Sequence, residues 1–136
     1  MTMETIALCL VAATLGAMLF LAVGIAPTVF QALPIEQAGT FLRRLFPRYY
    51  LALIIGSGLA GALWVQSAPW AGGTCLMVAL STLWVRQSLV PRINALRDAE
   101  LGGDEAAGMQ FARLHRLSVV INMIQLAALL FILIRY

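Results

Sequence analysis

Four long apolar stretches dominate this chain of 136 residues. A helix needs about 20 consecutive, mostly apolar residues to cross the hydrocarbon core of a membrane. Such stretches occupy residues 6–27, 50–66, 70–90 and 117–134. We therefore predict a single membrane domain over residues 1–136, folded as an all-α integral membrane four-helix bundle.

The composition agrees with lipid as the surrounding solvent. Hydrophobic residues make up 62% of the chain and charged residues only 11%, whereas soluble domains are about half apolar and a quarter charged. A globule this small could not bury so much apolar surface. The net charge of +3 is carried by arginine without any lysine. It is therefore no signal for nucleic acid, and the arginine bias favours a bacterial source.

The arginines also predict an orientation. The two long connections hold Arg43, Arg44, Arg48, Arg92, Arg97, Arg113 and Arg116. On the opposite side the turn at residues 67–69 is uncharged, and Arg135 is the only basic residue. Because positive charge is retained in cytoplasmic loops, both termini are predicted outside. The expected location is a bacterial inner (plasma) membrane, with membrane lipids as partners and a homo-oligomer or larger membrane complex as a further possibility.

The first connection has an amphipathic pattern. Its apolar residues recur at helical spacing, with arginines between them: Phe41, Leu42, Leu45, Phe46 and Tyr49. This pattern predicts an amphipathic surface helix at about residues 35–48 on the cytoplasmic face, between helices one and two. Pro47 is expected to end it before helix two, since proline removes a helical hydrogen bond.

The second connection divides at Gly102-Gly103. Residues 91–100 are predicted to extend helix three, and Asp104 is expected to cap a helix over residues 105–134. A faint repeat links the two connections, because Pro27 and Pro91 are each followed by a later Phe-x-Arg, at residues 41–43 and 111–113. A parallel duplication is one explanation of this pattern.

Helix four carries a polar stripe. His115, Ser118, Asn122 and Gln125 fall on one helical face. Polar groups in lipid need partners, so this face should point into the bundle. It could line a site for a ligand, proton or ion, or it could supply hydrogen bonds that hold the helices together.

Arg86 is the one charged residue inside an apolar stretch. It could extend to the cytoplasmic headgroups, bind an anionic headgroup, or stack on Tyr49 or Tyr50. We predict a cavity between helices two, three and four that takes a lipid headgroup or another amphipathic ligand. We expect its ligand-binding residues to be Arg86, His115, Ser118, Asn122, Tyr49 and Tyr50.

Helix two is rich in small residues. Gly56, Gly58 and Gly61 belong to small-xxx-small pairs, which let a neighbouring helix approach closely. We expect these three glycines to be helix-packing residues.

The sequence shows few residues suited to catalysis or to metal binding. No nucleophile–base pair appears, and every Asp and Glu lies outside the apolar stretches. His115 is the only histidine, and a zinc or copper site needs three or four ligands. No metal or other cofactor is therefore predicted, with haem as a minor alternative, and an enzyme is the less favoured reading.

Several segments together resemble a known membrane family. They are residues 24–30, 38–39, 45–50, 91–94 and 111–118 with Asn122, and they include Phe-Pro-x-Tyr-Tyr and Leu-His-x-x-Ser-x-x-x-Asn elements. The chain resembles the family called domain of unknown function 4149, whose eukaryotic members are named transmembrane protein 205. The resemblance implies four transmembrane helices. The eukaryotic relatives are linked to platinum-drug resistance, which suggests export or trafficking.

A more distant likeness is to bacterial membrane protoporphyrinogen oxidases and copper-resistance membrane domains. Those families place functional histidines in early helices, and the first apolar stretch here has none.

Three functions remain open from the sequence. The first is a non-catalytic membrane protein that serves as an accessory subunit or binds a lipid or other hydrophobic ligand. The second is a small oligomeric exporter or channel. The third is a haem- or quinone-linked redox protein.

Overall fold

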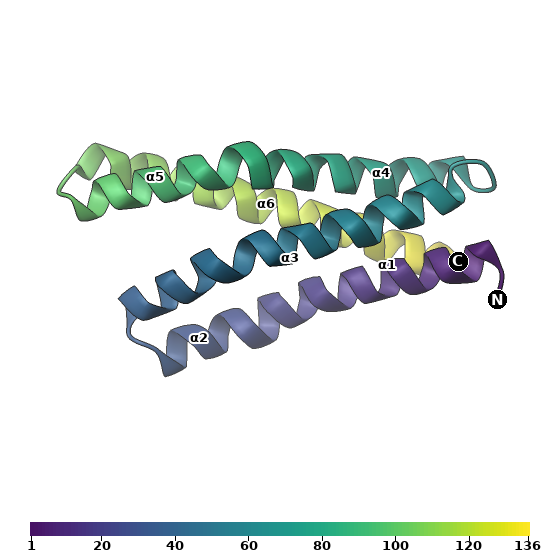
Figure 1. Ribbon diagram of the computed structural model, residues 1–136, viewed down its shortest axis with the longest axis horizontal. Coiled ribbons are helices and arrows are strands. Elements are labelled where there is room, and N and C mark those ends of the chain that lie inside the picture. The colour runs from purple at the N-terminus through teal and green to yellow at the C-terminus, as the bar shows by residue number, and fades with distance from the viewer.

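A computed structural model describes all residues, 1–136, and every regular element in it is helical. The helices form four rods, and each rod runs antiparallel to the one before it in the chain (Figure 1). The elements are α1 (Met3–Leu19), η1 (Phe20–Ile25), α2 (Ala26–Ala32), α3 (Ile35–Trp64), α4 (Pro69–Trp84), η2 (Val85–Leu89), α5 (Val90–Leu101) and α6 (Glu105–Arg135). The first rod is α1–η1–α2 and the third is α4–η2–α5, while α3 and α6 are single helices.

All four rods are long and apolar enough to cross a membrane. Each has 30 to 33 residues, which at 1.5 Å per residue is about 45–50 Å, well beyond a hydrocarbon core of about 30 Å. The predicted four-helix membrane bundle is confirmed. The predicted continuation of helix three is also confirmed, and Asp104 caps α6 by accepting a hydrogen bond of 3.1 Å from the Ala107 N–H.

The bundle has two chemically different ends. Both termini and the turn between α3 and α4 lie at one end (Figure 1), where Trp64 and Trp70 both stack on Tyr136. We call this the aromatic end. The loops after α2 and α5 lie at the other end, which we call the arginine end because it holds the arginines of both long connections.

The first and third rods each contain a π-helical segment. The segments η1 and η2 end two residues before Pro27 and Pro91. A proline has no N–H, and its ring would meet the carbonyl four residues back in a regular helix. The wider π turn moves that carbonyl away, so the Ala26 N–H bonds to Leu21, five residues back. The two halves therefore share this feature as well as the sequence repeat.

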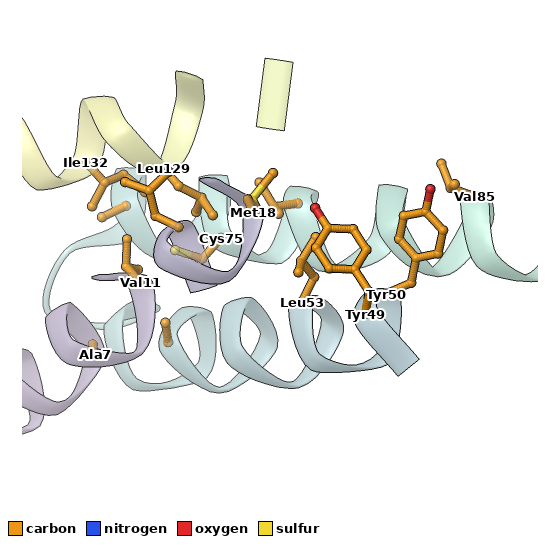
Figure 2. Close-up of a cluster of buried hydrophobic side chains, with 14 of the residues drawn as sticks. Ala7, Val11, Met18, Tyr49, Tyr50, Leu53, Cys75, Val85, Leu129 and Ile132 are labelled. Carbon is orange, nitrogen blue, oxygen red and sulfur yellow. The ribbon is translucent and has the colours of Figure 1, made fainter. Parts of the chain in front are cut away.

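A single hydrophobic core runs through the bundle. It contains 19 buried residues, and Figure 2 shows Val11, Met18, Leu53, Cys75 and Leu129 converging from four rods. This core therefore joins all four rods into one unit.

The segment 35–48 is not a separate surface helix, and this expectation was wrong. It continues without a break through Pro47 as the first half of α3. Part of its apolar face packs against α2, because Ala38 and Leu42 form a second, smaller core with Val29, whereas Phe41 is 45% exposed. Transmembrane helices tolerate an internal proline when neighbouring rods support the helix.

Two of the three glycines singled out in α3 lie at close contacts between helices. A Cβ added at Gly56 would collide with the Thr14 Oγ1, and one at Gly61 would lie 2.8 Å from Leu76. Gly58 differs, because the nearest atom, on Ala79, would be at an ordinary 3.8 Å. The tightest backbone approach involves Gly72 of α4, where a Cβ would lie 2.8 Å from the Val65 nitrogen.

Candidate functional site

Arg86 lies at the seam where η2 meets α3. Its Nε–H donates a hydrogen bond of 3.1 Å to the carbonyl oxygen of Pro47. The guanidinium has five N–H donors, and the remaining four make no hydrogen bond or ion pair in the structure. The side chain is half-buried. The bond to Pro47 fixes its position, and four N–H donors remain without a hydrogen-bond partner.

Arg86 also lies within the depth expected of a membrane. Sixteen residues separate it from Trp70 at the aromatic end, which corresponds to about 24 Å along the helix. Tryptophan and tyrosine mark the boundary of the hydrocarbon core, which is about 30 Å thick. Trp84, two residues before Arg86, is 50% exposed and suits the far boundary. Arg86 therefore lies close to that boundary, where its long side chain can reach headgroups.

Three aromatic rings adjoin this seam. Phe46 stacks on Tyr50 at 5.6 Å, and Tyr49 and Tyr50 are 5.2 Å apart. Figure 2 shows the rings of Tyr49 and Tyr50 side by side, with their hydroxyls directed away from α3. Tyr50 lies about one helical turn from Pro47, belongs to the same core cluster as Val85, and its hydroxyl makes no hydrogen bond.

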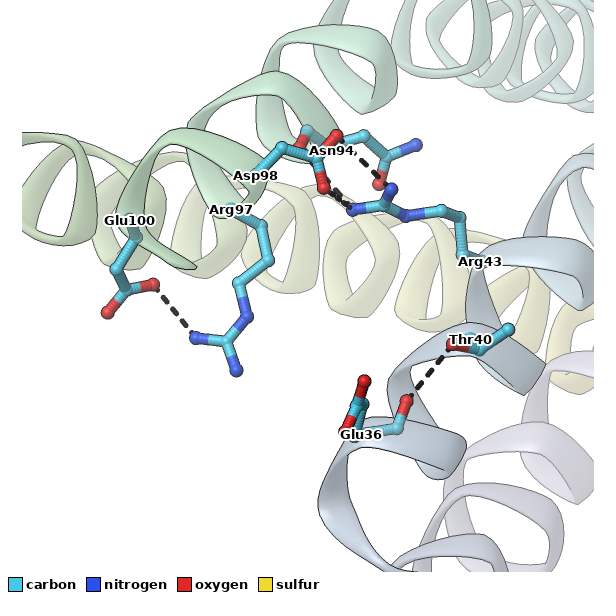
Figure 3. Close-up of polar contacts among 7 residues, drawn as sticks. All are labelled: Glu36, Thr40, Arg43, Asn94, Arg97, Asp98 and Glu100. Atoms are coloured by element: carbon cyan, nitrogen blue, oxygen red, sulfur yellow. Dashed lines mark hydrogen bonds and ion pairs between the residues drawn. The ribbon is translucent and has the colours of Figure 1, made fainter. Parts of the chain in front are cut away.

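A second arginine joins the same two rods nearer the arginine end. Arg43 of α3 contacts both carboxylate oxygens of Asp98 on α5, at 2.9 and 3.3 Å, and its Nη2 lies 3.4 Å from the Asn94 carbonyl oxygen (Figure 3). Arg43 and Pro47 are one turn apart on the same face of α3. The seam therefore carries two arginine links, one from each side.

Comparison with known protein families places this seam within a recognised domain. A family profile described as "Domain of unknown function (DUF4149)" matches residues 9–101, more than half of the chain. The protein belongs to the DUF4149 family. Comparisons with curated proteins and with solved structures gave no match.

In this DUF4149 member the matched residues include Arg86, Pro47, Tyr49 and Tyr50, but not α6. The polar stripe of α6 lies outside the match, including the Leu-His-x-x-Ser-x-x-x-Asn element on which the resemblance partly rested. The structure separates the members of this stripe into different surroundings.

Two stripe residues bond to other helices. The Asn122 amide and the Tyr49 hydroxyl are within 3.2–3.3 Å of each other. The Gln125 Nε2 donates to the Ser81 and Thr82 hydroxyls at 2.8 and 3.1 Å. These contacts favour the interpretation that this part of the stripe holds the bundle together.

The other two stripe residues make no contact with Arg86. The Ser118 hydroxyl donates to the His115 carbonyl oxygen of its own helix at 2.7 Å. His115 is exposed and stacks on Phe111 at 5.7 Å, while Arg97 of α5 lies 5.5 Å from the same ring. His115 is thus partnered by the α5–α6 pair rather than by the α3–η2 seam.

Two hollows on the surface lie away from Arg86 and His115. A shallow one follows the first rod along Phe20, Gly24 and Val29, and another follows Glu36, Gln37 and Thr40 of α3. Neither is lined by Arg86 or His115, so the shared cavity predicted between helices two, three and four stays a prediction. No group of three or more His, Cys, Asp or Glu side chains could hold a metal ion.

Proposed function

We propose that this protein is a non-catalytic membrane protein that binds an anionic, phosphate-bearing lipid headgroup at the α3–η2 seam. The observation that carries the proposal is that Arg86 is half-buried with most of its hydrogen-bond donors unpaired. Charged side chains at membrane depth are expensive unless they find partners, and only one of the five donors of Arg86 is used. A phosphate accepts two parallel N–H bonds from a guanidinium, which matches the donors that remain.

The surroundings suit the rest of a lipid. The Nε bond to Pro47 fixes the plane of the guanidinium, so little side-chain freedom is lost on binding. About one turn further towards the aromatic end, Leu51 and Leu83 are 44% and 41% exposed. An acyl chain lying against them would remain in apolar surroundings while its headgroup meets Arg86. The Tyr50 hydroxyl is a further donor or acceptor near the seam.

The same proposal includes a location. We place the protein in a bacterial inner membrane, with the arginine end in the cytoplasm and both termini outside, as the arginine asymmetry favours. The protein would act as a lipid-binding or accessory component, alone, as a homo-oligomer or in a larger membrane complex. A closer relation to the transmembrane protein 205 branch belongs to this proposal as well.

Lipid retention tests the proposed site. The protein is incorporated in nanodiscs of equal parts phosphatidylglycerol and phosphatidylcholine, and the lipids that stay bound after extraction are identified by native mass spectrometry. Arg86→Gln should reduce retained phosphatidylglycerol by about tenfold, the loss expected for a charged hydrogen bond. Arg92→Gln is the matched control, because Arg92 is exposed and makes no ion pair.

Two outcomes would contradict the proposal. Equal retention by wild type and Arg86→Gln would remove Arg86 from lipid binding. Displacement of phosphatidylglycerol by millimolar glycerol 3-phosphate would assign the site to soluble phosphate compounds, since that probe carries the phosphate without acyl chains.

A further inference from the structure

We infer that the Arg43–Asp98 ion pair is a releasable clasp that closes the seam on the cytoplasmic side of Arg86, with Asp98 taking the place of a second headgroup contact. The inference rests on the proposed function, because it concerns access to the same site. It assigns Arg43 as a second binding residue and Asp98 as its internal competitor.

The clasp is the only ion pair that joins two rods. The other pair in the structure, Arg97–Glu100, lies within α5 at a spacing of three residues. Arg43 instead reaches from α3 to α5, where it meets Asp98 at 2.9 Å and the Asn94 carbonyl at 3.4 Å. Figure 3 shows the two pairs, with Arg43 reaching from α3 to Asp98 and Arg97 paired with Glu100 of its own helix.

Little else holds the rods together at this level. The first half of α3 packs on α2 through a small core of Val29, Ala38 and Leu42, and Leu45 and Phe46 pack against both this core and the main core. Ile93 of α5 belongs to the main core with Phe111 and Leu114 of α6 packed against it. Figure 1 shows α2 and the start of α3 diverging from α5 and α6 towards the arginine end. Beyond Leu45 towards the arginine end, the only side-chain hydrogen bonds between α3 and α5 are those of Arg43. These two helices can therefore move apart there while Leu45 and Phe46 stay packed.

The clasp is also open to exchange. The side chains of Arg43 and Asp98 are 40% and 60% exposed, and ion pairs of this kind contribute little to stability because water competes for both charges. Phosphate offers a guanidinium the same bidentate geometry as a carboxylate. A headgroup arriving at Arg86 from the cytoplasmic leaflet would thus replace Asp98 on Arg43, and the freed Asp98 would return to water.

Removing the competing charge tests the clasp. In the nanodisc assay with phosphatidylglycerol and phosphatidylcholine, Asp98→Asn should retain about two- to fivefold more phosphatidylglycerol, in proportion to a surface ion pair. Glu100→Gln is the matched control. It also removes one negative charge, two residues after Asp98, but the ion pair that it breaks, Arg97–Glu100, lies within α5 and does not cross the seam. Arg43→Gln should reduce retention.

A distance measurement supplies a second readout. Spin labels at Thr40 of α3 and Ala99 of α5, both exposed, should move apart in Asp98→Asn and keep their wild-type distance in Glu100→Gln. Phosphatidylglycerol should lengthen the same distance in the wild type, and phosphatidylcholine alone should not.

The results separate this inference from the proposed function. If Arg86→Gln loses lipid but Asp98→Asn and Glu100→Gln behave alike, the clasp is wrong and the Arg86 site stands. If Arg86→Gln has no effect, the proposed site fails, and the clasp fails with it.

Discussion

Gly72 shows how strongly one residue constrains the packing of this bundle. An added Cβ there would lie within 3 Å of the backbone of Trp64 and Val65, and backbone atoms cannot move aside as a flexible side chain can. At the neighbouring Gly73 nothing lies within 4 Å of the same position. The sequence could not tell these two glycines apart, because only the rotation of α4 against α3 decides which of them faces the contact.

We expect Gly72→Ala to lower the free energy of unfolding by about 1–3 kcal/mol, the usual range for overpacking. Gly73→Ala should leave it unchanged or raise it slightly, because alanine favours helix over glycine. Thermal unfolding in detergent measures both variants. Equal midpoints for the two would contradict the close α3–α4 contact.

Gln125 makes the second residue-level prediction. It is 5% exposed, and its amide donates to both Ser81 and Thr82. Gln125→Leu should destabilise the bundle by about 0.6–2 kcal/mol, the range for hydrogen bonds between transmembrane helices. The effect stays modest because both hydroxyls also donate to the Val78 carbonyl. Gln110→Leu, at an exposed site without hydrogen bonds, is the control, and a loss of the same size there would argue against a specific network.

At the scale of elements, helix α3 differs most from what the sequence predicted, because it continues through Pro47 where a break was expected. A proline between an amphipathic segment and an apolar stretch reads as a break, because proline removes one helical hydrogen bond. The packing of Ala38 and Leu42 against Val29 of α2 decides otherwise, and that contact joins separate parts of the chain. The polar stripe of α6 was predictable from its spacing, whereas its partners Tyr49, Ser81 and Thr82 depend on how the rods are arranged.

A distance across Pro47 tests the continuity of α3. Spin labels at Gln37 and Ile55, both exposed, are 18 residues apart in the chain, so a continuous helix places their Cα atoms about 27 Å apart. A surface helix turned at right angles at Pro47 would bring them to about 19 Å. Pulsed electron paramagnetic resonance distinguishes the two, and a single population near the shorter distance would contradict the continuous helix.

At the scale of the whole molecule, the two ends of the bundle differ in a way that predicts its orientation. The aromatic end carries Arg135 as its only arginine, while the loops at the other end are flanked by seven. The four rods follow from hydropathy alone, because a lipid solvent allows few alternatives, and the arginines predict how the bundle is oriented across the membrane. The position of Arg86 against Pro47 follows from neither, since it depends on the seam between two rods.

Reporter fusions test this orientation. An enzyme that is active only outside the cytoplasm should be active when fused after Tyr136 and inactive when inserted at Gly103, since arginine-rich loops stay in the cytoplasm. The reverse pattern would invert the orientation and move Arg86 to the outer leaflet.

The contact between Arg86 and a lipid phosphate is the central claim, and solid-state NMR measures it directly. In phosphatidylglycerol bilayers, with arginine labelled at Cζ with ¹³C, the ¹³C–³¹P coupling should show a guanidinium carbon about 4 Å from phosphorus, the separation set by paired N–H···O bonds. That short-distance component should disappear in Arg86→Gln and persist in Arg92→Gln. A short component that is unchanged in Arg86→Gln would contradict the account, because the phosphate contact would then belong to other arginines.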